Sequence, residues 1–101
     1  MSAAAAFALT ASTPDTLAAS GAFTFATAAA ALAACRERLP RGNATLDLAG
    51  VAHADSAGLA VLLALAGDAR KHGGTLHIAN APESLRALAQ LADVDRLLGF
   101  A

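Results

Sequence analysis

The stretch LDLAGVAHADSAGLAVLLAL, residues 46–65, decides the fold. It starts as a short apolar strand, passes through a loop that contains Asp55 and Ser56, and continues as an almost uninterrupted apolar helix. A strand that leads directly into a helix is typical of α/β domains. The first turn of such a helix has backbone N–H groups without internal partners and a partial positive charge. It therefore suits a capping side chain, a phosphate or a partner's carboxylate.

The residues before this stretch predict a β-hairpin and a helix. Two short segments, Phe7–Thr10 and Thr16–Ser20, are separated by a turn-forming cluster of Ser, Thr, Pro and Asp. Gly21 is expected to end the second strand. The alanine-rich segment Thr24–Leu39 then predicts a helix, because its cations lie near its C-terminal end and a proline follows it.

The residues in and after this stretch alternate between strand and helix patterns. Ala44–Ala49 predicts a strand between helices, and the helix that contains Ser56 is expected to run to about His72. Gly73 and its neighbour permit the left-handed backbone that often ends a helix. Thr75–Ala79 then predicts another strand.

The last predicted element is a helix from Pro82 to about Ala92. Asn80 and Glu83 have the spacing of a capping box, with Asn in place of Ser or Thr. The resulting order, β-β-α-β-α-β-α, predicts the α/β class, with a mixed sheet of about four strands and helices packed against it. The chain of 101 residues has the length of one small domain with one core.

Composition excludes several function classes. The hydrophobic content of 56% is ample for a core, and the formal charge of −1 comes with scattered basic residues, which argues against nucleic-acid binding. No apolar run reaches the ~18–20 residues of a membrane span. The N-terminus lacks the cations and the long apolar region of a signal peptide, so a cytoplasmic location is expected. Cys35 is the single cysteine, which predicts a buried thiol without a disulfide or a metal.

The helix after Ser56 shows an apolar pattern on two sides. One side, at helical spacing, is expected to face the sheet: Leu59, Leu62, Leu63 and Ala66. The other side is expected to face outward and stays uncharged until Asp68: Gly58, Val61 and Leu65. Apolar surface beside Ser56 indicates a docking patch, whereas coverage by another element of the fold is the alternative.

Ser56 supports structural and functional interpretations. Serine is a favoured helix N-cap, and Asp55 could cap the same helix or stiffen the loop. Catalysis by Ser56 would need an activating base, and the surrounding ADSAG sequence is not a GxSxG elbow. An enzyme with His53 as the base is the weakest of the interpretations. No phosphate-binding glycine loop is present, and no cofactor is expected.

The DSAG loop at residues 55–58, between a strand and an apolar helix, resembles the D-[ST]-x-G loop of STAS domains. This fold is shared by anti-sigma factor antagonists and the cytoplasmic domains of sulfate transporters. The resemblance runs from about Leu17 through HGGTLHIAN to the end, so residues 1–101 are interpreted as a single STAS domain. The ending LRALAQLADVDRLLGF is most similar to the small STAS subunits of Mla-type phospholipid ABC transporters.

This resemblance implies a non-catalytic cytoplasmic subunit that binds the ATPase of a transporter maintaining outer-membrane lipid asymmetry, peripheral to the inner membrane through that partner. The alternative is an anti-sigma factor antagonist, bound by a serine kinase and switched by phosphorylation of Ser56. Phe23 and Thr24 stand where an acid often follows the second-strand glycine in antagonists. The residues expected to bind the partner are Asp55, Ser56, Ala57, Gly58, Val61 and Leu65.

Overall fold

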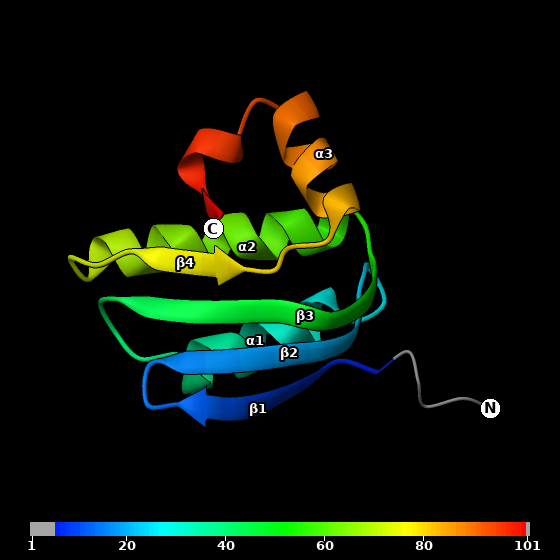
Figure 1. Cartoon of the computed structure of the whole chain (residues 1–101). Coiled ribbons are helices and arrows are strands. Elements are labelled where there is room, and N and C mark those ends of the chain that lie inside the picture. The colour runs from blue at the N-terminus through cyan, green and yellow to red at the C-terminus, as the bar shows by residue number, and fades with distance from the viewer. Residues whose placement is uncertain (1–5, 101) are drawn as a thin grey trace.

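A computed structural model describes residues 6–100 and shows a mixed α/β fold (Figure 1). The sheet has one strand more than the sequence predicts, because a short C-terminal strand joins it. Its order is β1 (Ala8–Thr13), β2 (Thr16–Phe23), β3 (Ala44–Ala54), β4 (Leu76–Ala79) and β5 (Gly99–Phe100). The hairpin of β1 and β2 is antiparallel, as predicted, and every other neighbouring pair is parallel.

Three α-helices pack around this sheet, together with a 3-10 helix, η2 (Asp95–Leu97). In Figure 1, α1 (Ala28–Arg38) and α2 (Ser56–Lys71) lie side by side behind the strands, and α3 (Glu83–Leu91) stands next to α2 at the upper edge. These helices cover one face of the sheet and leave the other open. Within residues 6–100, no helix is both long and apolar enough to cross a bilayer.

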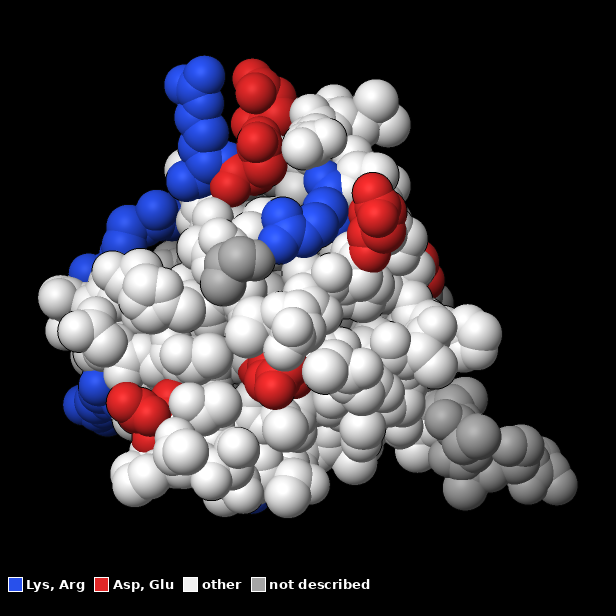
Figure 2. Space-filling view, in the orientation of Figure 1, with Lys and Arg blue, Asp and Glu red and all other residues white. Residues whose placement is uncertain are grey.

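The core lies between the sheet and these helices, and the strands contribute alternate residues to it. In β3, Leu46 and Leu48 are fully buried while Thr45 and Asp47 are half-buried on the opposite face. This is the period-2 pattern of a sheet with one covered face. The open face carries few charges, chiefly that of Asp47, and Figure 2 shows most charged side chains gathered around its edges.

Two strand boundaries differ from those predicted. Gly21 does not end β2, because its positive φ of 88° accompanies shifts in register against β3 that let the strand continue to Phe23. β3 extends to Ala54, five residues beyond the predicted end, and Ala22 and Phe23 pair with His53 and Ala54. The longer strands bring the end of β2 next to the start of α2.

The predicted capping box of α3 does not form. Asn80 adopts a positive φ of 55° and its Nδ2 donates to Oδ1 of Asp47 at 3.0 Å, so the side chain ties two strands together instead of capping the helix. The α3 N-cap position is Pro82, whose carbonyl accepts from the N–H groups of Leu85 and Arg86. By contrast, the predicted left-handed exit from α2 is confirmed at Gly73, where φ is 77°.

Candidate partner-binding site

The start of α2 is capped by Asp55, and Ser56 is the first residue of the helix. Oδ1 of Asp55 accepts from the backbone N–H groups of Ala57 at 2.8 Å and Gly58 at 3.4 Å. Of the two caps that the sequence allowed, the aspartate is therefore the one that forms. Its carboxylate satisfies N–H groups that would otherwise lack partners.

The second oxygen of Asp55 holds a different loop. Oδ2 accepts from the backbone N–H of Phe25 at 3.1 Å, and this residue lies in the loop between β2 and α1. The Phe25 N–H, followed by those of Ala57 and Gly58, holds the pKa of the Asp55 carboxyl below its usual value, against a smaller opposing effect of desolvation. One ionised carboxylate thus connects the starts of both helices.

Thr27 stiffens this loop from the other side. Its hydroxyl contacts the carbonyl oxygens of Ala22 at 2.9 Å and Thr24 at 3.2 Å, and its oxygen accepts from the Thr24 N–H at 3.0 Å. These contacts pin the backbone on both sides of the loop. Phe25 is therefore presented on a fixed backbone between Asp55 and Thr27.

The exposed aromatic ring of Phe25 is the feature that the sequence analysis missed. Its side chain is 85% exposed, whereas Phe23, two residues earlier, is fully buried. Ser56 is exposed as well, and its hydroxyl makes no hydrogen bond to another described residue. An aromatic residue directly after a buried strand, before an alanine-rich helix, was the available signal. Phe25, Ser56, Ala57 and Ala60 are called the Ser56 surface below.

The prediction that Gly58, Val61 and Leu65 face outward is wrong. Val61 is 4% exposed, Leu65 is 3% exposed, and Gly58 is buried against Phe23. The reason is that α2 packs against the sheet and is flanked by α1 and α3, so it buries more than the single stripe of a helix that touches only a sheet. These three residues support the site from inside and offer no surface to a partner.

The outward side of α2 is lined by small residues instead. Ala60 is exposed, and Ala64 and Gly67 are half-buried on the same side of the helix. Leu63, expected to face the sheet, is also only half-buried. Charge appears on this helix only from Asp68 onward. The Ser56 surface therefore continues into an uncharged helix face that permits close approach of another polypeptide.

The geometry offers no support for chemistry at Ser56. His53 is exposed near the end of β3, and no hydrogen bond joins it to Ser56 in the part of the chain that the structure describes. Over residues 6–100, no group of three or more His, Cys, Asp or Glu side chains could hold a metal ion. What the site presents is a free hydroxyl, an aromatic ring and small apolar side chains on a rigid backbone.

Solved structures show the same fold at low sequence identity. The anti-sigma factor antagonist SpoIIAA in its unphosphorylated form is 15% identical, with a TM-score of 0.70 over 94% of this chain and 87% of that one. The phosphorylated form of the Bacillus protein gives a TM-score of 0.63 over 94% and 90%. The anion transporter family member SLC26A9 gives 0.69 at 14% identity over 80% of this chain, which corresponds to 16% of that chain. No curated protein sequence matches the chain.

A family model described as "Mlab, STAS domain" matches residues 8–99. This match spans nearly the whole chain and includes the capped loop, the first four strands and the first residue of β5. The chain therefore belongs to the STAS domain family.

Proposed function

From this family membership, we propose that the chain is a non-catalytic cytoplasmic STAS subunit that binds the ATPase of an Mla-type phospholipid ABC transporter. The family model carries the Mla description over residues 8–99. The observation that carries the binding role is the exposed ring of Phe25, whose backbone N–H donates to the same Asp55 carboxylate that caps the helix beginning at Ser56. Aromatic anchors surrounded by small apolar residues are typical of the centre of protein interfaces.

The Ser56 surface is suited to a rigid contact with one partner. Its backbone is fixed from both loops by Asp55 and Thr27, so association would cost little conformational entropy there. Its side chains bear no charge, which matches the depletion of charged residues at interface cores. The role is to complete and stabilise an ATPase assembly, with lipid and ATP handled by partner subunits.

The test is copurification of the tagged chain from its native host. The proposal predicts recovery of an ABC ATPase with its membrane subunits. Phe25→Glu places a charge at the centre of the interface and should abolish recovery. Leu91→Glu is the matched control, because Leu91 on α3 is 86% exposed and lies outside the Ser56 surface. Undiminished ATPase recovery by a folded Phe25→Glu variant would remove this surface from the interaction.

A second candidate, an anti-sigma factor antagonist switched at Ser56, is favoured by one observation. The Ser56 hydroxyl is exposed at the N-terminus of α2, where a phosphate is stabilised by the helix. The nearest N–H groups already donate to Asp55, so a phosphate carrying about −1.5 to −2 charge would compete with that carboxylate. Displacing Asp55 would release the N–H of Phe25 and loosen the Ser56 surface.

The same copurification separates the two candidates. Recovery of a serine kinase and a sigma factor, with a phosphate on Ser56 detected by mass spectrometry, supports the antagonist. Recovery of an ATPase with Ser56 unmodified supports the transporter subunit. Ser56→Glu should weaken binding in either case, whereas Ser56→Ala, which removes no cap in this structure, should leave the fold unchanged.

A further inference from the structure

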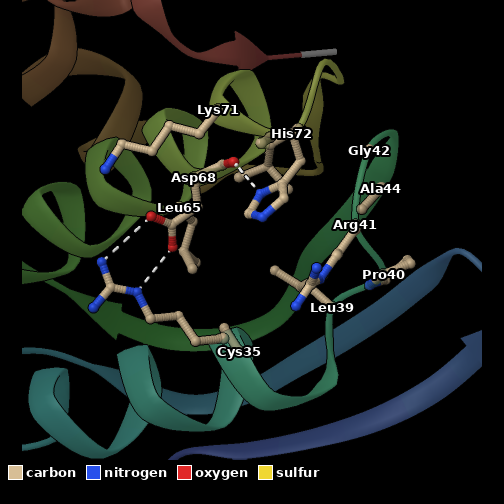
Figure 3. A pocket seen from close by; sticks show the side chains of 13 residues that line it. Cys35, Leu39, Pro40, Arg41, Gly42, Ala44, Leu65, Asp68, Lys71 and His72 are labelled. Atoms are coloured by element: carbon tan, nitrogen blue, oxygen red, sulfur yellow. Dashed lines mark hydrogen bonds and ion pairs between the residues drawn. The ribbon is translucent and has the colours of Figure 1, made fainter.

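A cavity of about 380 Å³ opens at the end of α2 opposite to Ser56 (Figure 3). It lies between the C-terminal ends of α1 and α2 and the start of β3. Its volume is in the lower part of the roughly 300–1,000 Å³ range of small-molecule sites. The cavity is separate from the Ser56 surface, so the two can be tested independently.

The inner wall of this cavity is apolar. Buried or half-buried side chains from both helices, both adjoining strands and the connecting loop form it: Cys35, Leu39, Ala44, Leu65 and Leu76. Burial raises the pKa of the Cys35 thiol to about 11, against a smaller opposing effect of Arg38, which is consistent with an apolar setting. This wall fits a hydrocarbon group better than a polar one.

The rim is cationic. Arg41 and Lys71 line the cavity, and within residues 6–100 neither side chain forms an ion pair or a hydrogen bond. Arg36 is also at the rim, but its charge is matched by Asp68, whose Oδ2 lies 2.8 Å from the Arg36 Nε. The rim therefore carries one cation, Arg41, that no acid balances, whereas the charge of Lys71 interacts with Asp68 and helps to lower the pKa of that carboxyl. Figure 3 shows the Arg41 side chain directed toward the opening.

His72 adds a polar group to the same opening. Its Nδ1 lies 2.8 Å from the carbonyl oxygen of Asp68, which can only accept, so Nδ1 carries the proton in this contact. Nε2 remains available, and Figure 3 shows the ring beside the opening, facing Arg41.

The carbonyl groups at the end of α2 do not cancel this positive field. A helix C-terminus carries partial negative charge on its unpaired carbonyls. Here the carbonyls of Ala69 and Arg70 accept from the N–H groups of Gly74 and Gly73, at 2.9 and 3.0 Å. With these groups paired in a Schellman arrangement, the full charge of Arg41 dominates the rim.

From this combination, we infer that the cavity binds an anionic amphiphile, a carboxylate or phosphate monoester joined to a short apolar chain. The chain lies against the wall near Leu65 and Leu76. The head group is held at the rim by Arg41, and Lys71 adds to the positive potential there. A purely apolar ligand would leave the Arg41 charge without a counter-ion, and a simple anion would leave the apolar wall without a contact.

The experiment is a titration of the ¹⁵N-labelled full chain followed by amide resonances. The probes are octanoate and octyl phosphate, with octylammonium as the charge-reversed control and inorganic phosphate as the head group alone. Both anionic amphiphiles should shift resonances around Leu39, Ala44 and His72, and a preference between them would identify the head group. Octylammonium and inorganic phosphate should bind at least about tenfold more weakly.

Two pairs of variants test the wall and the rim separately. The double variant Arg41→Gln, Lys71→Gln should weaken binding at least about tenfold, as expected when charge-assisted hydrogen bonds are lost, while Arg70→Gln, outside this cavity, should not. Ala69→Leu should fill the cavity and block binding, whereas Ala64→Leu on the same helix should not.

Several results would overturn the inference. They are the absence of shifts with either anionic amphiphile at millimolar concentration, equal binding of octylammonium, and shifts confined to residues near Ser56. Unchanged affinity in the folded Arg41→Gln, Lys71→Gln variant would equally reject the cationic rim. A circular dichroism spectrum matching that of the parent chain establishes that each variant is folded.

Discussion

The two ends of α2 are built on different principles. At the N-terminal end, Asp55 caps the helix with two backbone contacts and holds the neighbouring loop with a third, and Gly58 lets the helix lie directly on Phe23. At the C-terminal end, the backbone closes the helix by itself through Gly73 and Gly74, and the side chains beyond Leu65 stand around a cavity. One end has little internal room and presents a surface, and the other encloses space for a ligand.

The two glycines of α2 show this difference. At Gly58 there is no room for a side chain, because the backbone of Phe23 lies against it, whereas nothing lies within 4 Å of a Cβ added at Gly67. Apolar content alone therefore does not identify a docking face. What distinguishes the two ends is the identity of the atoms that each helical turn contacts.

The largest expected effect concerns Cys35 in the wall of the cavity. Raising its pKa from 9.0 to about 11 lowers the thiolate fraction about 100-fold near neutral pH, and burial adds a steric barrier. Alkylation by iodoacetamide at pH 8 should therefore be at least about 100-fold slower in the folded chain than in urea. The rate is measured by mass spectrometry. Equal rates would mean that the cavity end opens freely.

The next effect sharpens the contrast between the two glycines. A Cβ at Gly58 would lie 2.5 Å from the Phe23 carbonyl oxygen, so Gly58→Ala should lower the free energy of unfolding by about 1–3 kcal/mol. Gly67→Ala should instead raise it by about 0.5–1 kcal/mol, since only the entropy of the unfolded chain changes. Urea denaturation measures both. Equal effects of the two substitutions would contradict the tight contact at the N-terminal end.

The sequence predicted those parts of the fold whose patterns are local. The hairpin, three helices and the strand before Ser56 followed from turn residues and apolar spacing, although most boundaries shifted by a few residues. β5 could not be predicted, because Gly99 and Phe100 form a strand only by pairing with His77 and Ile78 after η2 returns the chain to the sheet edge. Two residues carry no periodicity.

The candidate site was predicted in part for a related reason. The positions of Asp55 and Ser56 at the N-terminus of α2 followed from the local loop and strand–helix pattern. The burial of Val61 and Leu65 did not, because it depends on how closely α1 approaches. The alanine-rich sequence of α1, with Ala31 and Cys35 buried, permits that approach and covers the flank of α2. A helical wheel of one segment contains no information on its neighbours.

A smaller effect is expected from pH at the N-terminal end. The pKa of Asp55 is lowered in the folded chain by its backbone partners, led by Phe25. Its contribution to stability is therefore complete above the unfolded pKa of about 3.9 and is lost as the pH falls through the lower folded pKa. Asp55→Asn should reduce the decrease of the unfolding midpoint, called the acid limb here, as the pH falls from about 5 to 2. Ser56→Ala, which leaves that carboxyl in place, should keep the limb, and an unchanged limb in Asp55→Asn would contradict this assignment.

The smallest effect belongs to the ion pair beside the cavity. Arg36 joins Asp68 at 2.8 Å and thereby links α1 to α2, and its hydrogen bond holds the pKa of Asp68 below the usual value. Both side chains are solvent-accessible, at 52% and 33%, so water screens their attraction. A double-mutant cycle with Arg36→Gln and Asp68→Asn should give a coupling energy near experimental error, vanishing in 1 M NaCl. A coupling that persists in high salt would instead make this pair the contact that sets the width of the cavity, because no other side-chain hydrogen bond or ion pair joins the two helices within residues 6–100.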